Sequence, residues 1–276
     1  MGLQEFLDGI PLLLYLLLTT VLMVSFIEIG FRAPKNDQGK TNKAQIAQVR
    51  AIMGASLGLL AFMLAFSFSR AQSHFEDRID AYILEIGAID SAYRGADLLD
   101  ERQRASAKKL LRQFVQLRRD TSSAVDSDEL EEIIEMIREA ERIHDKLWMV
   151  ADSAMSSPGD SIDDSIFVNA ILEMIKANDE RLQATLFNRI SLVIWLALIL
   201  MSCISMIVMG YQARLSGTRS VIATWTLAFA FAAVMTLVTD LDRPQTSLFK
   251  LNESLMIELQ NRINEDASSV IESESG

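Results

Sequence analysis

The sequence predicts an all-α, polytopic membrane protein with four transmembrane helices and an antiparallel helical bundle outside the membrane. Three observations support this prediction. Half of the 276 residues are hydrophobic although 23% are charged, and the two kinds are segregated along the chain. Apolar residues recur at spacings of three and four through the charged regions, which is typical of helices. No segment carries a persuasive strand pattern.

Four stretches contain no Asp, Glu, Lys or Arg, namely residues 9–27, 51–69, 190–213 and 220–239. A helix needs about 20 residues to cross a hydrocarbon core about 30 Å thick, and backbone polar groups in lipid must be satisfied internally. Buried core helices are the alternative, but four such lengths in one chain favour membrane spans. Glu5 and Asp8 precede the first span where a signal peptide needs positive charge, so we expect this span to stay as an anchor.

These spans divide the chain into four parts. Residues 1–69 hold spans one and two with a basic loop, and residues 70–188 form an acidic helical bundle outside the membrane. Residues 189–246 hold spans three and four, and residues 247–276 form an amphipathic helix with an acidic tail.

Basic residues in the short loops predict the orientation. The loop between spans one and two carries five of them, and the loop between spans three and four carries two: Arg32, Lys35, Lys40, Lys43, Arg50, Arg214 and Arg219. Because Lys and Arg favour cytoplasmic loops, residues 70–188 and both termini are expected to be extracytoplasmic. We therefore expect a multi-pass protein of the inner (plasma) membrane, although Arg70, Arg78, Arg181 and Arg189 also lie close to a span.

Four helices are predicted outside the membrane. The first continues from span two without a break, and the second covers about 101–119. Asp126 and Glu129 fit a capping box for a third helix that ends near Met155. Ser161 and Asp164 fit a second box, for a fourth helix that we expect to run unbroken into span three. After span four, an apolar stripe can pack on this bundle, and it consists of Leu248, Leu251, Leu255, Leu259 and Ile263. The last residues, 265–276, are polar and acidic and are predicted to be disordered.

Charge and residue usage narrow the function. Segment 70–188 has 15 Lys and Arg against 25 Asp and Glu, a net charge of −10, which argues against nucleic acid as a partner. The partner implied by the spans is the lipid bilayer. His74 and His144 are too few for a histidine metal site or catalytic triad, no phosphate-binding glycine loop is present, and Cys203 lies inside span three. We expect no catalytic residue, no metal, no cofactor and no enzymatic activity.

Span two carries two sets of candidate residues on neighbouring arcs. Gly54 and Gly58 form a GxxxG pattern, which Ala61 and Ala65 continue, and small faces of this kind let helices approach closely in lipid. We favour packing within one subunit over pore lining for this small face. The second arc consists of large apolar residues followed by two polar ones: Leu59, Phe62, Phe66, Ser69 and Arg70. Around an axis in several copies, these side chains could form a hydrophobic constriction, or they could face lipid or core.

Two further positions combine charge with a span. Glu28 is the one acid within an apolar run, and it either has a function or simply snorkels to the interface or pairs with Arg32. Residues 239–245, TDLDRPQ, end span four. They act either as a stop signal or as a knot in which Asp240 or Asp242 pairs with Arg70, Arg78 or Arg94.

The sequence resembles the bestrophin-like family of bacterial membrane proteins, a domain family of unknown function. The resemblance rests on GLLAFMLAFSFSRAQSHFEDR, EIGAIDSAYRGADLL and DLDRPQ. The matching positions are Phe66, Ser67, Glu85, Ala88, Tyr93, Arg94, Leu98, Leu99, Asp240, Asp242, Arg243 and Pro244. The sequence departs from the family pattern after Pro244, where QTSLFKLN lacks a glycine, and at residues 72–74, where a more basic run is usual.

The resemblance implies a homo-oligomeric pore for inorganic ions, because bestrophins are pentameric anion or cation channels. Bestrophins keep their soluble portion in the cytoplasm, whereas the charge rule places it outside here, so either the topology is inverted or only the helical layout is shared. A channel with span two at its axis is one hypothesis. A membrane-anchored sensor or scaffold, whose outer bundle binds a ligand or a protein, is the other.

Overall fold

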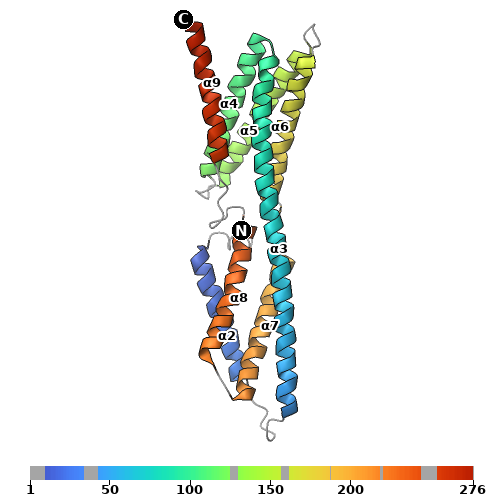
Figure 1. The fold of residues 1–276 in the computed structure, drawn as a ribbon, viewed down its shortest axis with the longest axis vertical. Coiled ribbons are helices and arrows are strands. Elements are labelled where there is room, and N and C mark those ends of the chain that lie inside the picture. Colours follow the sequence, from blue (N-terminus) through green and yellow to red (C-terminus); the bar gives the residue numbers. More distant parts are fainter. Residues whose placement is uncertain are drawn as a thin grey trace. The chain divides into compact units, whose positions relative to one another are not determined.

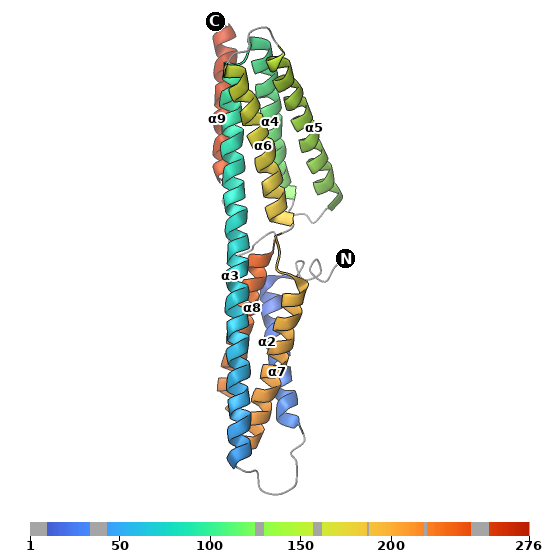
Figure 2. The same ribbon diagram turned by 90° about the vertical axis from the view of Figure 1, so that its right-hand side faces the viewer.

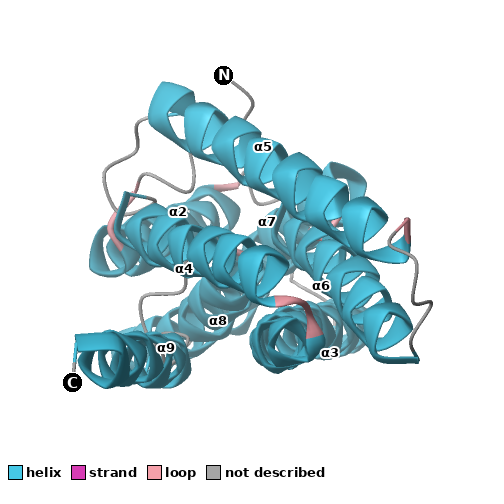
Figure 3. Ribbon diagram, turned by 90° about the horizontal axis from the view of Figure 1, so that it is seen from above, coloured by secondary structure: helices cyan, strands magenta, loops and turns pink. Residues whose placement is uncertain are grey.

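The computed structural model describes residues 10–33, 43–124, 130–156, 162–186, 188–217, 220–243 and 254–275, and every element within these ranges is a helix (Figures 1 and 3). The elements are α2 (Leu12–Arg32), α3 (Lys43–Gly95), the short 3-10 helix η1 (Ala96–Leu98), α4 (Glu101–Ala124), α5 (Leu130–Met155), α6 (Ile162–Leu186), α7 (Leu192–Ser216), α8 (Val221–Asp242) and α9 (Ser254–Ser275). The all-α prediction is therefore confirmed.

The chain forms two compact units. The membrane unit comprises Met1–Glu76 and Asn188–Lys250, and the bundle unit comprises Asp77–Phe187 and Leu251–Gly276. Within the described ranges, four helices are long and apolar enough to cross a membrane: α2, α3, α7 and α8. The boundary between the units falls inside α3, which is an unbroken helix of 53 residues. This helix meets the prediction that span two continues beyond its charge-free part, since nothing from Leu59 to Gly87 is a strong helix breaker.

In the membrane unit, α2 packs against α7 and α8 (Figure 1). The helices α2 and α7 approach each other at two glycines. A Cβ on Gly30 would overlap the backbone carbonyl of Ile207, and a Cβ on Gly210 would overlap that of Ile27. Such close approach maximises van der Waals contact where lipid provides no hydrophobic driving force between helices. At the same end of these helices, Arg214 donates to the backbone oxygen of Phe31 at 2.8 Å.

Local sequence sets the ends of the spans. Ser191 and Ser220 are the N-caps of α7 and α8, and their hydroxyls accept from the backbone N–H groups of Val193 and Ala223. Gly217 ends α7 in the left-handed conformation, with φ of 67°, which glycine adopts without a Cβ penalty. Five hydroxyls inside the spans donate to carbonyls one turn earlier, which satisfies them without water: Thr20, Ser25, Ser202, Thr236 and Thr239.

The prediction that the fourth outer helix runs unbroken into span three is wrong. Helix α6 ends at Leu186 and α7 begins at Leu192, and residues 188–191 are not helical. The break has a physical basis, because Ser191 caps α7 and the Asp242 carboxylate accepts the backbone N–H of Ile190 at 2.7 Å. These side chains replace the intrahelical partners that a continuous helix would supply.

In the bundle unit, α4 packs against α5, and α5 packs against α6 (Figure 2). The buried face of α4 follows the helical repeat, with Ala107, Leu111, Phe114 and Val115 all fully buried. The capping residues predicted for α5 and α6, Asp126, Glu129 and Ser161, lie outside the described residues. The observed helices α5 and α6 begin at Leu130 and Ile162, directly after these positions.

The prediction that residues 265–276 are disordered is wrong for residues 265–275, which belong to helix α9. This helix runs from Ser254 to Ser275 and packs on α4. Leu259 and Ile263, both in the predicted stripe, are buried, and Met256 is buried beside them, whereas Leu255 is exposed. Leu248 and Leu251 lie outside the described residues. Asp266, expected in the loose tail, is held by two hydrogen bonds that are described below.

Candidate functional site

Within the membrane unit, α3 buries one narrow arc. Leu60, Leu64, Ser67, Ala71 and His74 are at most 5% exposed, and their spacing of three and four places them on one face. This face contacts the apolar core of the unit, which includes Trp195, Leu198 and Met235. Met63, Phe68 and Phe75 flank this face and are half-buried against the same core.

The aromatic arc of α3 is exposed in the isolated chain. Leu59, Phe62 and Phe66 are 49%, 69% and 61% exposed, and Ser69 and Arg70 after them are exposed as well. Successive residues of a helix are about 100° apart, so this arc lies largely opposite the buried one. These side chains are thus available to lipid, to other copies of the chain or to a central axis.

The small arc of α3 is also open. A Cβ added to Gly54 or Gly58 would meet nothing within 4 Å, and Ala61 and Ala65 are exposed. Packing within one subunit, which we favoured for these residues, is therefore not what the structure shows. Among the described glycines, Gly30 and Gly210 make the closest contacts with a neighbouring helix.

The C-terminal end of α8 carries a buried polar cluster. Asp240, Asp242 and Arg243 are 0%, 5% and 7% exposed. Asp242 accepts the backbone N–H of Ile190 at 2.7 Å and the indole N–H of Trp195 at 3.4 Å. Asp242 therefore joins the end of span four to the start of span three.

Two predictions about ion pairs at the spans can now be compared with the structure. Arg94, one of three bases considered for the acids of α8, pairs instead with Asp90 at 3.0 Å. Pro244 lies outside the described residues. Glu28 pairs with Arg32 at 3.0 Å, as one of its two interpretations predicted.

In the bundle unit, Glu85 is the centre of a buried ion-pair triad. Its side chain is fully buried, and its two carboxylate oxygens accept from Arg118 Nε at 2.9 Å and Arg118 Nη2 at 3.1 Å. Arg181 Nε lies 2.9 Å from the second oxygen. Burial lowers the pKa of Arg181 to about 10, and the neighbouring charge of Arg118 adds to this lowering. A bidentate pair and a second arginine fix α3, α4 and α6 in one register.

His144 of α5 is buried close to this triad. Its ring contacts that of Phe114 in a tilted arrangement, with centroids 4.9 Å apart and planes 48° apart, and its Nε2 has no hydrogen-bond partner among the described residues. Burial lowers the pKa of His144, and the charges of Asp179 and Glu85 oppose that lowering. The structure thus places an imidazole in the core, where burial disfavours its charged form.

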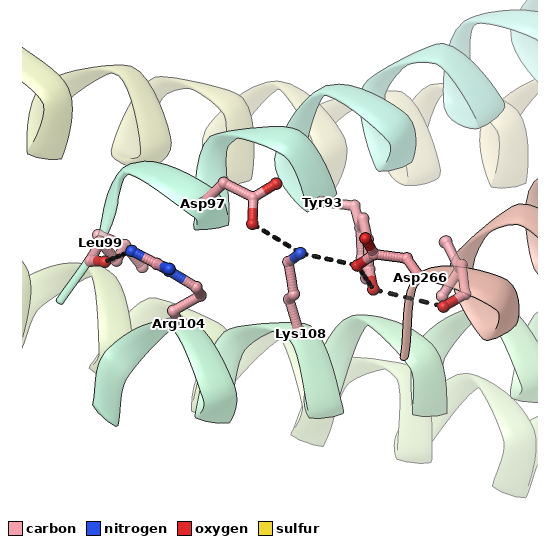
Figure 4. Close-up of polar contacts among 7 residues, drawn as sticks. Tyr93, Asp97, Leu99, Arg104, Lys108 and Asp266 are labelled. Carbon is pink, nitrogen blue, oxygen red and sulfur yellow. Dashed lines mark hydrogen bonds and ion pairs between the residues drawn. The ribbon is translucent and has the colours of Figure 1, made fainter. Parts of the chain in front are cut away.

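Tyr93 belongs to a second network, which holds α9 (Figure 4). The Tyr93 hydroxyl donates to Asp266 Oδ2 at 2.9 Å, and Lys108 Nζ lies 2.8 Å from the same oxygen and 2.6 Å from Asp97. The ammonium also lies 4.7 Å from the centroid of the Tyr93 ring. The hydrogen bond from Lys108 lowers the pKa of Asp266. Arg262 adds a further ion pair between α9 and α3, with Asp90 at 2.7 Å.

The chemistry of these clusters is structural. Glu85, Tyr93 and Asp242 contact other elements of the fold, whereas Arg94 pairs with Asp90 on its own helix. No group of three His, Cys, Asp or Glu side chains that could hold a metal ion occurs in the described part of the chain. What the membrane unit offers is an exposed helix face, with small residues on one arc and aromatic residues on the next.

Comparison with known proteins assigns the fold to a family. The model of the Bestrophin-like domain family matches residues 14–253. The chain belongs to the bestrophin-like family. A crystal structure of a single-substitution variant of a bacterial bestrophin homologue from Klebsiella pneumoniae has the same fold, with a TM-score of 0.59 and 13% sequence identity. The match covers 92% of this chain and 97% of that one. No curated protein matches.

Several residues that hold the fold of this bestrophin-like protein were missed by sequence reasoning. Arg118 and Arg181 are the partners of Glu85. No local sequence pattern identifies them as such, because they lie on helices far from Glu85 in the sequence. Gly30 and Gly210 are single glycines without a GxxxG pattern. For Asp266, acidity and a polar context suggested disorder, although Met256, Leu259 and Ile263 continue at helical spacing towards it.

Proposed function

We propose that this bestrophin-like protein is a homo-oligomeric ion channel in which α3 lines the central axis. One observation supports this most directly: Leu59, Phe62 and Phe66 are large apolar side chains on one arc, and they stay 49%, 69% and 61% exposed in the protomer. In a ring of identical chains, this arc forms a hydrophobic constriction that gates ions by excluding water. Family membership favours transport over catalysis.

In the same assembly, the small arc meets the neighbouring subunit. Gly54, Gly58, Ala61 and Ala65 lie beside the aromatic arc, so a helix that turns its phenylalanines to the axis presents its small residues sideways. Small residues suit a close contact between helices in lipid. Inorganic ions and further copies of this chain are the partners of the proposed channel, and nucleic acid is not.

Conductance tests the proposal. The protein is reconstituted in planar bilayers, and Phe62→Ala and Phe66→Ala are compared with wild type. We expect larger or longer openings, because smaller side chains reduce the hydrophobic barrier. Phe229→Ala is the matched control, since Phe229 is an exposed phenylalanine on α8, 52% exposed, that has no place in the constriction. Equal effects of all three substitutions, or no current from any protein, would contradict the assignment of the axis to α3.

A sensor or scaffold is the alternative function. It places the working surface on the bundle unit and needs no ring. Particle images of the detergent-solubilised protein separate the two, because a closed ring with an axial path supports the channel and a dimer supports the sensor.

The orientation is a further part of the proposal. Basic residues in the two short loops favour a bundle unit outside the cytoplasm. In a Cys203→Ala background, a cysteine replacing Ser123 should react with an impermeant thiol reagent on intact cells, and one replacing Thr41 should not. Reaction of the Ser123 position only after lysis reverses the orientation.

A further inference from the structure

We propose that the membrane unit binds one alkyl chain of a bilayer lipid in a cavity between α2, α7 and α8. The cavity has a volume of about 160 Å³. Its floor is buried and consists of Met23, Ser202, Met206 and Met235, none more than 5% exposed. Leu22 and Ile199, which are 47% and 39% exposed, stand at its open side.

The lining is mainly apolar and offers little to a polar ligand. It contains no charged residue. The hydroxyl of Thr19 donates to the backbone of its own helix, to Tyr15 at 2.8 Å or Leu16 at 3.1 Å, and that of Ser202 donates to Leu198 at 2.8 Å. Because these two hydroxyls already donate hydrogen bonds, water gains little by binding to them. Apolar cavities of about 150 Å³ stay dry and take up small hydrocarbons.

The position of the cavity indicates that its ligand comes from the lipid bilayer. All of its lining residues lie on three helices that are apolar and long enough to cross a membrane. Ile199 to Met206 occupy the middle of α7, so the open side faces the hydrocarbon core when the helices span a bilayer. The surrounding medium then consists of acyl chains. A chain end that enters gains contacts with the methionine side chains of the floor, which adapt readily to its shape.

Cys203 lines the cavity and is the chain's one cysteine, so it reports occupancy directly. Lipid-depleted protein in detergent is treated with methyl methanethiosulfonate, with and without n-decane, and labelling is followed by intact mass. We expect n-decane at about ten times its dissociation constant to slow labelling about tenfold, because only about one cavity in eleven is then empty. The matched control is Leu200→Cys in a Cys203→Ala background, whose site is 60% exposed on the same helix outside the cavity and whose labelling rate n-decane should not change.

A cavity-filling variant tests whether n-decane protects Cys203 by occupying the cavity. Thr19→Leu adds apolar volume to the cavity, so Cys203 should label slowly with or without n-decane. Val21→Leu adds volume to the exposed side of the same helix and should behave as wild type. Mass spectrometry of gently purified protein should find more retained phospholipid on wild type than on Thr19→Leu.

Three results overturn the proposal. Equal slowing of labelling at Cys203 and at the Leu200→Cys site means that n-decane acts on the micelle. A Cys203 that stays unreactive after lipid depletion, with no effect of n-decane, means that a neighbouring subunit fills the cavity. A Cys203 that labels at the same rate with and without n-decane means that no alkyl chain binds.

Discussion

Glu85 shows how one residue can decide the stability of the bundle unit. Its carboxylate is fully buried between Arg118 and Arg181, and removal of its charge leaves two buried guanidinium groups with nothing to balance them. A buried ion pair that loses one partner costs about 3–5 kcal/mol. We expect Glu85→Gln to lower the free energy of unfolding by about this amount, measured by denaturant or heat in detergent.

The control for Glu85 is Glu135→Gln. Glu135 also contacts two arginines, Arg138 and Arg142, at 3.3 Å each, but it is 57% exposed. Exposed pairs contribute about 0–1 kcal/mol. Equal losses from the two substitutions would mean that the triad has no special role.

His144 gives the bundle unit a dependence on pH. Burial lowers its pKa in the folded protein below the usual value of 6.5. A histidine with a lowered folded pKa stabilises the fold above the unfolded pKa, and this stability is lost as pH falls through the folded pKa. We therefore expect the melting temperature of wild type to fall between pH 7.5 and pH 5, and that of His144→Gln to fall less. His74 is present in both proteins and cancels in the comparison. The same slope in both would exclude His144 as the cause.

At the residue scale, the sequence predicts where the family residues lie but not what they contact. Glu85 and Tyr93 were identified by resemblance, while the partners that explain them, Arg118 and Asp266, come from α4 and α9. Periodicity assigns a residue to a face of its own helix. It does not tell which charge on another helix meets that face, because this depends on the register of tertiary packing.

Among the elements, the spans and most outer helices were predictable because their signals are local. Length without charge identifies α2, α7 and α8, and the absence of breakers from Leu59 to Gly87 predicts the continuity of α3. The break before α7 was not predictable in the same way. Residues 182–191 contain no proline or glycine, and the break is stabilised by Asp242 from the end of α8.

Asp242 therefore has an expected effect on the start of α7. Asp242→Ala removes the acceptor for the buried N–H of Ile190, and an unsatisfied buried donor costs about 1–3 kcal/mol. We expect lower thermal stability and faster hydrogen exchange at the Ile190 amide. Asp152→Ala is the control, because Asp152 is exposed on α5 and its loss should change stability little. Unchanged exchange at Ile190 would show that Asp242 does not hold this turn.

On the scale of the whole molecule, the two units differ in how much of their apolar surface a single chain buries. The bundle unit covers its core with α9, whose buried Met256, Leu259 and Ile263 join the same cluster as Phe114 and Leu147. The membrane unit leaves both the small arc and the aromatic arc of α3 uncovered. Assembly through α3 is the arrangement that would use both arcs at once.

Two glycine substitutions distinguish assembly from folding. Gly58 has no neighbour within 4 Å, so Gly58→Leu should leave the protomer folded but obstruct a close contact with another subunit. Gly210 touches the backbone of α2, so Gly210→Ala should force α2 and α7 apart and destabilise the protomer itself. Light scattering coupled to size exclusion should then give a smaller particle for Gly58→Leu with wild-type helical content, and circular dichroism should give a lower melting temperature for Gly210→Ala. If the Gly58→Leu particle has the wild-type size, the small arc of α3 is not part of the subunit interface. A leucine at a close contact between subunits would separate the two helices.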